Sequence, residues 1–222
     1  MLFLNRNEAG RLLGMQLMEF ANRDDVIVLA LPRGGVPVGF EIARALSAPL
    51  DVLTVRKLGV PGHEEYAMGA IASDGVRILN KAAIESLGIR SEEIESVAAR
   101  EARELERREH QYRSGREALD VLGRIVILVD DGLATGSTMR VAVVAVRRKN
   151  PRQTVVAVPV AARSTCEQLK NEADRVVCLH LPIEFYSVGQ WYADFGQMSD
   201  EEVRELLDAA AENLQQRGVR AR

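Results

Sequence analysis

The sequence predicts an α/β domain with a mostly parallel central sheet flanked by helices. Short apolar runs rich in β-branched residues alternate along the chain with segments whose apolar residues recur at helical spacing. That alternation is typical of strand–helix–strand units, whose crossovers are right-handed. The 222 residues suffice for one domain with a substantial core, and 47% hydrophobic and 27% charged residues are ordinary values for a globular protein.

Five apolar runs are expected to form strands, because each is short, continuous and rich in valine, isoleucine and leucine. These strands are predicted at residues 26–31, 50–58, 124–130, 153–161 and 175–181. Helices are predicted at 8–21, from the loop 32–39 to about residue 46, at 137–150 ahead of Pro151, and after Ser164. A capping box, Ser-Asp-Glu-Glu at 199–202, opens a last helix.

Three further segments complete the predicted structure. Residues 67–79 are typical of a hairpin, because the Asp-Gly pair at 74–75 suits a type I′ turn. The segment 58–66 contains glycine and proline and is expected to be a mobile loop. A long charged helix is predicted at 91–113, with Ser91 as its N-cap. Its apolar stripe is narrow, so the helix is expected to lie on the surface or to meet a partner.

Charge and cysteine content argue against several classes of function. The net charge of −3 gives no reason to expect a surface for nucleic acid or anionic membrane. The two cysteines and three histidines match no zinc-site spacing. No apolar run approaches the roughly 20 residues of a membrane span, and the first residues lack the apolar region of a secretory signal. We therefore expect a cytoplasmic protein in a reducing compartment.

The segment VILVDDGLATGST, residues 126–138, is the most informative motif. An apolar strand ends in Asp130 and Asp131, and small or hydroxylated residues follow at once. In open α/β sheets, ligands bind at the carboxyl ends of the strands. The N–H groups of such a loop and of the next helix can hold a phosphate, while the carboxylates accept hydrogen bonds from sugar hydroxyls. A phosphorylated sugar therefore explains both halves of the motif.

Two other interpretations of this segment compete. A serine that merely caps a helix, beside two surface aspartates, would explain either half of the motif alone. It does not explain both halves in this order at one strand–helix junction. A response-regulator receiver also carries an acidic pair, but after its first strand. Here more than half of the chain precedes the pair, and no later strand ends in a suitable aspartate, so we reject the receiver.

The motif closely resembles the phosphoribosyl-pyrophosphate signature of the type I phosphoribosyltransferases. The resemblance implies that Asp130 and Asp131 bind the 2′- and 3′-hydroxyls of the ribose. It also implies that the next residues hold the 5′-phosphate, namely Ala134, Thr135, Gly136, Ser137 and Thr138.

A second segment, ALPRGGVPVG at 30–39, resembles the pyrophosphate loop of the family, in particular that of the xanthine-guanine enzyme. By this resemblance, Arg33 offers a cation and Gly34 and Gly35 offer accessible N–H groups to a diphosphate. In relatives this loop often contains a non-proline cis peptide. The three-residue pattern alone is weak evidence, because strand–glycine–helix turns are common, but it too falls at the carboxyl end of a strand.

A third segment, VRKLGVPGHEEYAMGA at 55–70, resembles the family's flexible loop. Such a lid would exclude water, which otherwise hydrolyses the activated sugar. The resemblance makes Arg56 and Lys57 candidate pyrophosphate ligands and, with Arg33 and the two aspartates, candidate catalytic residues. An ordinary surface pair is the alternative for Arg56 and Lys57.

Five aromatic residues cluster in PIEFYSVGQWYADF, residues 182–195. This segment resembles the base-binding segment of the 6-oxopurine enzymes. The resemblance implies that Phe185 or Tyr186 stacks on a base, that the backbone near Val188 reads the base edge, and that Asp194 lies near magnesium. The segment is one residue longer than the family's before that aspartate, so the register stays open. The alternative is that these aromatics form core beneath the C-terminal helix.

We expect a single phosphoribosyltransferase-like domain over residues 1–222. Its core is predicted at about 26–79 and 124–181, with a helical insert at about 80–120. A hood is predicted from about 182–222 together with 1–22. The charged insert departs from the small purine enzymes, and the sequence assigns it no role.

The resemblance implies a Mg²⁺-dependent enzyme of nucleotide salvage. It would transfer the 5-phosphoribosyl group from phosphoribosyl pyrophosphate to a nucleobase-like acceptor and release pyrophosphate. Because relatives are often dimers, a homodimer is a further expectation. The alternative is a regulator that senses phosphoribosyl pyrophosphate without turnover. The two intact pyrophosphate-binding segments favour the enzyme.

The acceptor base stays open. The 6-oxopurine enzymes carry an acid/base aspartate at the position of Ala134, whereas the adenine enzyme has alanine there. They also read the oxo group with a lysine on the strand after the signature helix, and residues 158–165 contain none; Arg163 is the nearest cation. Hypoxanthine or guanine is therefore not supported as the substrate.

Overall fold

The computed structural model describes residues 2–72, 75–216 and 218. Its centre is a sheet of five parallel strands in the order β2-β1-β6-β7-β8, which confirms the predicted α/β class. The strands are β1 (Val26–Ala30), β2 (Leu50–Val52), β6 (Ile125–Val129), β7 (Gln153–Val160) and β8 (Arg175–His180).

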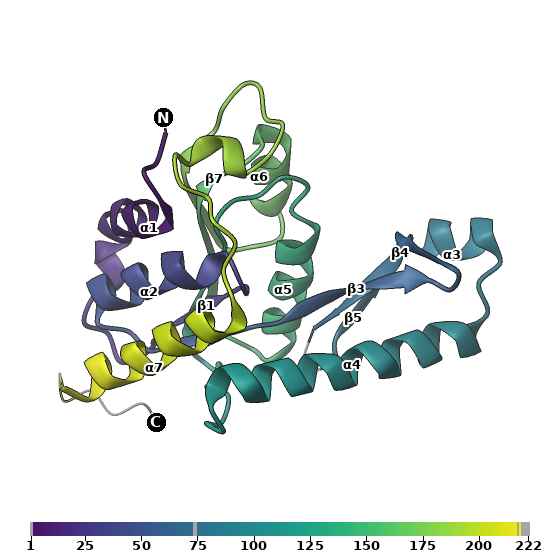
Figure 1. Cartoon of the computed structure of the whole chain (residues 1–222), viewed down its shortest axis with the longest axis horizontal. Helices are drawn as coiled ribbons and strands as arrows, with labels where there is room; N and C mark the ends of the chain where they lie inside the picture. The colour runs from purple at the N-terminus through teal and green to yellow at the C-terminus, as the bar shows by residue number, and fades with distance from the viewer. Residues whose placement is uncertain (1, 73–74, 217, 219–222) are drawn as a thin grey trace.

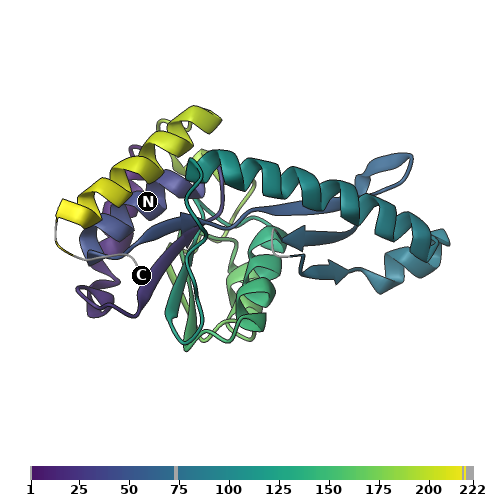
Figure 2. The same cartoon turned by 90° about the horizontal axis from the view of Figure 1, so that it is seen from below.

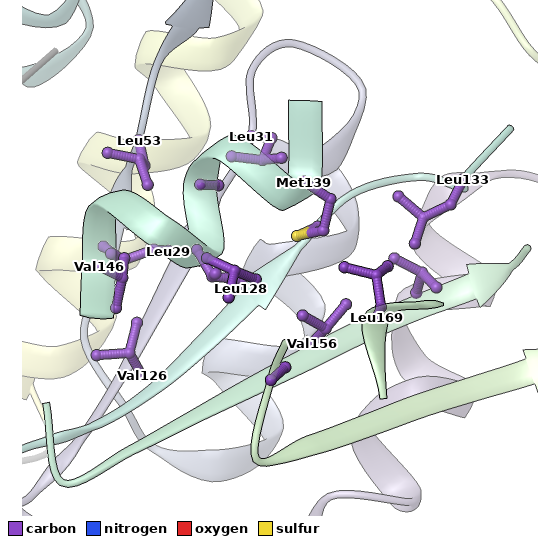
Figure 3. Close-up of a cluster of buried hydrophobic side chains, with 14 of the residues drawn as sticks. Leu29, Leu31, Leu53, Val126, Leu128, Leu133, Met139, Val146, Val156 and Leu169 are labelled. Atoms are coloured by element: carbon purple, nitrogen blue, oxygen red, sulfur yellow. The ribbon is translucent and has the colours of Figure 1, made fainter. Parts of the chain in front are cut away.

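Helices cover both faces of this sheet (Figure 1). One face packs on α1 (Arg6–Met15), the short η1 (Met18–Phe20) and α2 (Gly35–Leu46). The other face packs on α5 (Ser137–Arg148) and α6 (Arg163–Leu169), and Figure 3 shows this core. All residues of β1 and β6 are buried, and those of 26–29 and 125–129 alternate between the two clusters, as expected for a parallel sheet covered on both sides.

Residues 55–72 and 75–113 form an arm that projects to one side of the parallel sheet (Figures 1 and 2). It contains a separate antiparallel sheet in the order β3-β4-β5, made of β3 (Val55–Val60), β4 (His63–Ala72) and β5 (Arg77–Leu79). Two helices follow, α3 (Lys81–Leu87) and α4 (Ser91–Arg113). The long α4 lies across this sheet and buries an apolar stripe against it, as its narrow stripe predicts for a surface helix.

The arm corrects two predictions from the sequence. The run 50–58 is not one strand, because β2 ends at Val52 and the chain resumes as β3 in the other sheet. The segment 58–66 is not a loop: β3 and β4 pair through it, with a turn at Pro61 and Gly62. The reason is tertiary, since Leu58 and Val60 are buried in the cluster beneath α4, while the turn needs only the left-handed Gly62.

Two smaller expectations about the arm have different outcomes. The hairpin predicted at 67–79 is present as β4 and β5, and residues 73–74 of its turn lie outside the described part of the chain. Ser91 is not the N-cap of α4. Arg90 occupies that position, and its backbone N–H donates to Glu93 Oε2 at 3.0 Å.

Buried polar contacts attach the base of the arm to the parallel sheet. Arg113 Nε donates to Asp51 Oδ1 at 2.8 Å, and its other nitrogens reach Glu109 and the carbonyl of Val52. Glu109 in turn accepts from the backbone N–H of Thr54 at 2.8 Å. Because these charged groups are paired and nearly fully buried, they fix where α4 meets the β2–β3 junction.

The last helix, α7 (Asp200–Gln216), packs on α2, β2 and α4. Its predicted capping box is confirmed, with Ser199 and Glu202 exchanging hydrogen bonds at 2.7 and 3.1 Å. A second 3-10 turn, η2 (Gly189–Trp191), lies in the segment before it. Within the described part of the chain, no helix has both the length and the apolar character needed to cross a bilayer.

Replacing Leu105 with alanine is expected to lower the free energy of unfolding by about 2–5 kcal/mol. Leu105 is fully buried between α4 and the arm's sheet, so the truncation leaves a cavity. Urea denaturation followed by circular dichroism measures the change. Leu87→Ala, on the exposed side of α3, is the matched control and should change stability by no more than about 0.5 kcal/mol. Equal effects of the two changes would contradict the packing of α4.

Candidate functional site

The site lies where the adjacent parallel strands β1 and β6 end at the same edge of the sheet. Ala30 pairs with Val129, the last residue of β6, and Leu31 N–H donates to the carbonyl of Val129 at 2.8 Å. The segment after β1 therefore begins beside Asp130. On the other side of β6, Leu133 bridges to Ala161 just past β7. Three chain segments thus meet at one edge, the usual place for ligands in this class of fold.

Asp130 and Asp131 are half-buried at this edge. Asp131 N–H donates to Asp130 Oδ1 at 2.8 Å, and Asp131 Oδ2 accepts from Arg6 Nε at 2.8 Å. Burial and the neighbouring charge of Asp131 raise the pKa of Asp130 well above its ordinary value. Burial also raises the pKa of Asp131, and Arg6 opposes that rise. Two crowded carboxyls with raised pKa values are suited to a ligand that brings hydrogen-bond donors or a cation.

The loop after this pair is open to solvent and leads into α5. Ala134, Thr135, Ser137 and Thr138 are exposed, whereas Gly136 is buried with φ of 68°. The first N–H groups of a helix have no intrahelical partner. At the start of α5, the N–H of Ser137 donates to Thr135 Oγ1 at 3.5 Å, and the hydroxyls of Thr135 and Ser137 lie 3.2 Å apart. This arrangement can bind a phosphate group.

Thr165, at the start of α6, fixes the back of that loop. Its hydroxyl donates to the carbonyl of Ala134 at 2.5 Å. Its methyl group lies where a side chain on Gly136 would have to go. Gly136 is therefore required twice, for its left-handed backbone and for its contact with Thr165.

The segment after β1 packs directly against the acidic pair. The peptide bond between Pro32 and Arg33 is cis, as the resemblance leads one to expect. A Cβ on Gly34 would lie 2.6 Å from Asp131 Cγ, and one on Gly35 would lie 2.7 Å from the carbonyl oxygen of Val129. Only glycine at both positions allows this approach, which places the backbone of residues 33–35 next to Asp131.

Arg33 points toward the meeting point of α4 and α7. Its Nη1 lies 3.9 Å from Asp200 Oδ1, and 40% of its side chain is exposed. Tyr112 donates to the same carboxylate oxygen at 2.7 Å. Burial and Asp200 raise the pKa of Tyr112 to about 12, so the tyrosine keeps the proton that it donates. The Arg33 side chain is thus directed to Asp200 and stays partly accessible, while its backbone leads into Gly34 beside Asp131.

The structure separates Arg56 from Lys57. Arg56 Nε lies 2.6 Å from Glu101 Oε2 of α4, with Glu104 at 3.7 Å, so its guanidinium faces the arm's helix. Lys57 is exposed. Alternate residues of a strand share a face, so Lys57 lies on the same face of β3 as Val55, which packs toward α5. Lys57 therefore lies on the strand face directed toward α5, whereas Arg56 would have to leave two carboxylates to reach a ligand.

The aromatic segment folds back over the acidic pair. Tyr192 is buried and stacks with Phe195, and its hydroxyl donates to the carbonyl of Asp131 at 2.5 Å. Burial raises the pKa of Tyr192, so it remains a donor. Val188 sits 2.6 Å from where a Cβ of Gly132 would be. The segment therefore covers the end of the motif that carries Asp130 and Asp131.

The other predicted residues of this segment are less enclosed. Phe185 is half-buried and stacks on Trp191 with centroids 6.5 Å apart, whereas Tyr186 is 81% exposed. Asp194 is exposed, accepts from Gly196 N–H at 3.1 Å, and lines a cavity of about 540 Å³ with Arg6. The core alternative holds in part, because Tyr192 packs on Phe3, but the partner is the N-terminal segment rather than α7.

Arg6, Tyr192 and Thr165 are the site residues that the sequence did not indicate. Each contacts the motif 126–138 across at least 31 positions of chain. None belongs to a short motif of its own, so only the folded chain reveals it. Tyr192 alone offered a signal, because it lies in the aromatic cluster.

The carboxylates fit magnesium better as part of a complex with substrate than in a cage made by protein alone. Among the described residues, no three histidine, cysteine or acidic side chains form a group that could hold a metal. Mg²⁺ prefers oxygen ligands and is often bound through one or two carboxylates plus substrate phosphates. The crowded carboxyls of Asp130 and Asp131 provide oxygens of that kind.

Comparison with known proteins identifies relatives of the whole chain. Residues 4–192 match the family model described as the phosphoribosyl transferase domain. Two Mycobacterium tuberculosis proteins, from strains CDC 1551 / Oshkosh and H37Rv, are 43% identical over 98% of this chain, and each is named "putative phosphoribosyl transferase". This chain spans about half of their length, 49%. The crystal structure of TT1426 from Thermus thermophilus is 42% identical, with a TM-score of 0.80, over 93% of this chain and 98% of that one.

Gly34→Ala is expected to weaken binding of ribose 5-phosphate about tenfold or more. The backbone of Gly34 has φ of −59°, so alanine is not strained there, and its Cβ instead displaces the carboxylate of Asp131. Isothermal titration calorimetry measures the affinity, and circular dichroism verifies the fold. A folded variant with unchanged affinity would show that the approach of residues 33–35 to Asp131 is unimportant for the ligand.

Thr165→Val is expected to weaken ribose 5-phosphate binding about two- to tenfold, because it removes one hydrogen bond that holds the loop while keeping the shape of the side chain. The matched control is Thr154→Val. Thr154 is fully buried, and its hydroxyl has no hydrogen-bond partner among the described residues. Titration of both variants should show a loss for Thr165→Val alone; equal affinities would argue against the role of Thr165.

Proposed function

We propose, from the premise that this chain belongs to the phosphoribosyl transferase domain family, that it transfers the 5-phosphoribosyl group of phosphoribosyl pyrophosphate to a nitrogen base and releases pyrophosphate. The observation that carries the proposal is the approach of two segments at one sheet edge. Gly34 touches Asp131, so the segment proposed to bind diphosphate lies beside the pair proposed to bind the sugar. A ligand that joins a diphosphate to a phosphorylated pentose matches that arrangement.

The chain's own groups account for the parts of such a ligand. Asp130 and Asp131 accept hydrogen bonds from the ribose hydroxyls, which stabilise carboxylates whose pKa values burial has raised. The exposed loop 134–138 and the start of α5 bind the 5′-phosphate. Arg33 and the N–H group of Gly34 face the diphosphate, and Lys57 approaches from β3. The N–H of Gly35, expected from the sequence to be accessible, instead donates to the carbonyl of Leu31 at 3.0 Å.

Displacement of pyrophosphate passes through a positively charged, oxocarbenium-like sugar. The residues contribute by positioning and by electrostatics, because the nucleophile is the base itself and the leaving group is already activated. Mg²⁺, when bound, would neutralise the charge of the diphosphate. Arg33 adds a cation at the leaving group, while the carboxylates sit beside the ring whose positive charge develops. Tyr192 and Val188 shield this end from water.

The acceptor is proposed to enter beneath the aromatic segment. Phe185, Tyr186 and the backbone near Val188 are the groups suited to a flat heterocycle, since aromatic faces stack on bases. Ala134 offers no acid or base at the position where the 6-oxopurine enzymes carry aspartate. The base must therefore supply a nitrogen that attacks without that residue, and the proposal leaves its identity to experiment.

A panel of nucleobases tests the proposal directly. The protein is incubated with phosphoribosyl pyrophosphate, Mg²⁺ and each base, and pyrophosphate release is measured. Release that depends on one base and is abolished by a chelator supports the transferase with its magnesium requirement. Tight binding of phosphoribosyl pyrophosphate without release for any base would instead support the sensing regulator. Absence of both binding and release would overturn the proposal.

Asp130→Asn and Asp131→Asn should each weaken binding of phosphoribosyl pyrophosphate about tenfold or more, because a charged hydrogen-bond acceptor is replaced by a neutral amide. Calorimetric titration in the presence of Mg²⁺ provides the measurement. Asp120→Asn is the control, since Asp120 is exposed and precedes β6, at the opposite end of that strand. Affinities that match the wild type in both site variants would exclude this pair as the sugar site.

A further inference from the structure

Arg6 is held at the acidic pair by three contacts. Its Nε donates to Asp131 Oδ2 at 2.8 Å, and its Nη1 donates to the carbonyl of Gly196 at 2.8 Å. The guanidinium carbon lies 3.9 Å from the centroid of the Phe195 ring. Only 12% of the Arg6 side chain is exposed. The guanidinium is therefore oriented by these contacts and largely withdrawn from solvent.

These contacts fix the orientation of the Asp131 carboxylate. Arg6 donates to Oδ2, so the proposal assigns the ligand to Oδ1. The carboxyl of Asp131 also interacts with that of Asp130, its neighbour in the pair. The backbone of Asp131 is held separately, because Tyr192 donates to its carbonyl at 2.5 Å. On the remaining side, Gly34 leaves no space between its own backbone and the carboxylate. Without Arg6, a half-buried carboxylate would lose its cation and could rotate.

We propose that Arg6 is a positioning residue for the pentose subsite: it orients Asp131 so that one carboxylate oxygen meets a ribose hydroxyl, and it thereby ties the N-terminal segment to the site. This inference rests on the proposed function, since it concerns the same ligand. Arg6 acts through Asp131 and touches no part of the substrate.

The geometry calls for arginine at this position. A planar guanidinium can donate in two directions while its face lies on an aromatic ring. Here the two acceptors are Asp131 and Gly196, which belong to different segments, and the ring is that of Phe195. A lysine can supply the charge to Asp131 but cannot make all three contacts. Arg6→Lys is therefore expected to retain part of the ligand affinity that Arg6 provides, and Arg6→Met none of it.

The choice of ligand separates positioning from general damage. Phosphoribosyl pyrophosphate carries the ribose hydroxyls, whereas inorganic pyrophosphate lacks them. In calorimetric titrations with Mg²⁺, Arg6→Met should weaken binding of phosphoribosyl pyrophosphate about tenfold or more and leave inorganic pyrophosphate within about twofold. Arg6→Lys should fall between Arg6→Met and the wild type. A loss of both ligands in equal measure, or of neither, overturns the inference.

A double-mutant cycle tests whether Arg6 acts through Asp131. In the Asp131→Asn background, adding Arg6→Met should weaken binding by no more than about twofold further, because the oriented carboxylate is already gone. Losses that multiply as for independent sites overturn the inference. If Arg6→Met does not fold, as circular dichroism would reveal, the same cycle with Arg6→Lys decides the question.

Arg175 provides a matched control. It also pairs with a carboxylate, Glu19, at 2.6 Å, and its guanidinium carbon lies 5.6 Å from the centroid of Phe20. Arg175→Met should leave both affinities unchanged, and a loss equal to that of Arg6→Met overturns the inference. Wild-type protein that binds neither ligand would overturn the proposed function itself. A wild type that binds, together with an Arg6 variant of the same affinity, would overturn only the role of Arg6.

Discussion

The parallel pairing of β1 with β6 is the constraint on which the site depends. It sets Ala30 opposite Val129. The segments that follow the two strands therefore leave the sheet at the same level and lie directly against each other. Gly34 and Gly35 permit that contact, because any side chain there would collide with Asp131 or with the end of β6. The close approach of the two segments thus follows from the register of β1 and β6 and from the absence of side chains at Gly34 and Gly35.

The N-terminal segment and the aromatic segment close this edge together. Phe3 pairs with Tyr192 as a bridge, and the backbone N–H groups of Ala193 and Asp194 donate to the carbonyls of Phe3 and Leu4. This pairing brings Arg6 and Tyr192 to the same residue, Asp131, one through its carboxylate and one through its carbonyl. Residues near the start of the chain therefore shape a site whose motif lies more than a hundred positions later.

The arm is coupled to the site at its base. Tyr112, near the end of α4, and Arg33 share Asp200 at the start of α7. The buried Arg113, Asp51 and Glu109 hold that end of α4 against the parallel sheet. A displacement of α4 would thus reach the segment after β1 through Asp200. The charged helix, which the sequence left without a role, contributes to placing Arg33.

The sequence by itself determined what local periodicity and short motifs encode. Local patterns in the sequence predict the five parallel strands, the order of the helices, the capping box at Ser199 and the acidic pair with its loop. Each of these features depends on neighbours a few residues away. Tertiary structure decided the rest. It split the run 50–58 between two sheets, turned the expected loop at 58–66 into paired strands beneath α4, directed Arg56 to Glu101, and brought Arg6 to Asp131. Those outcomes depend on which distant surfaces become buried together, and no local pattern carries that information.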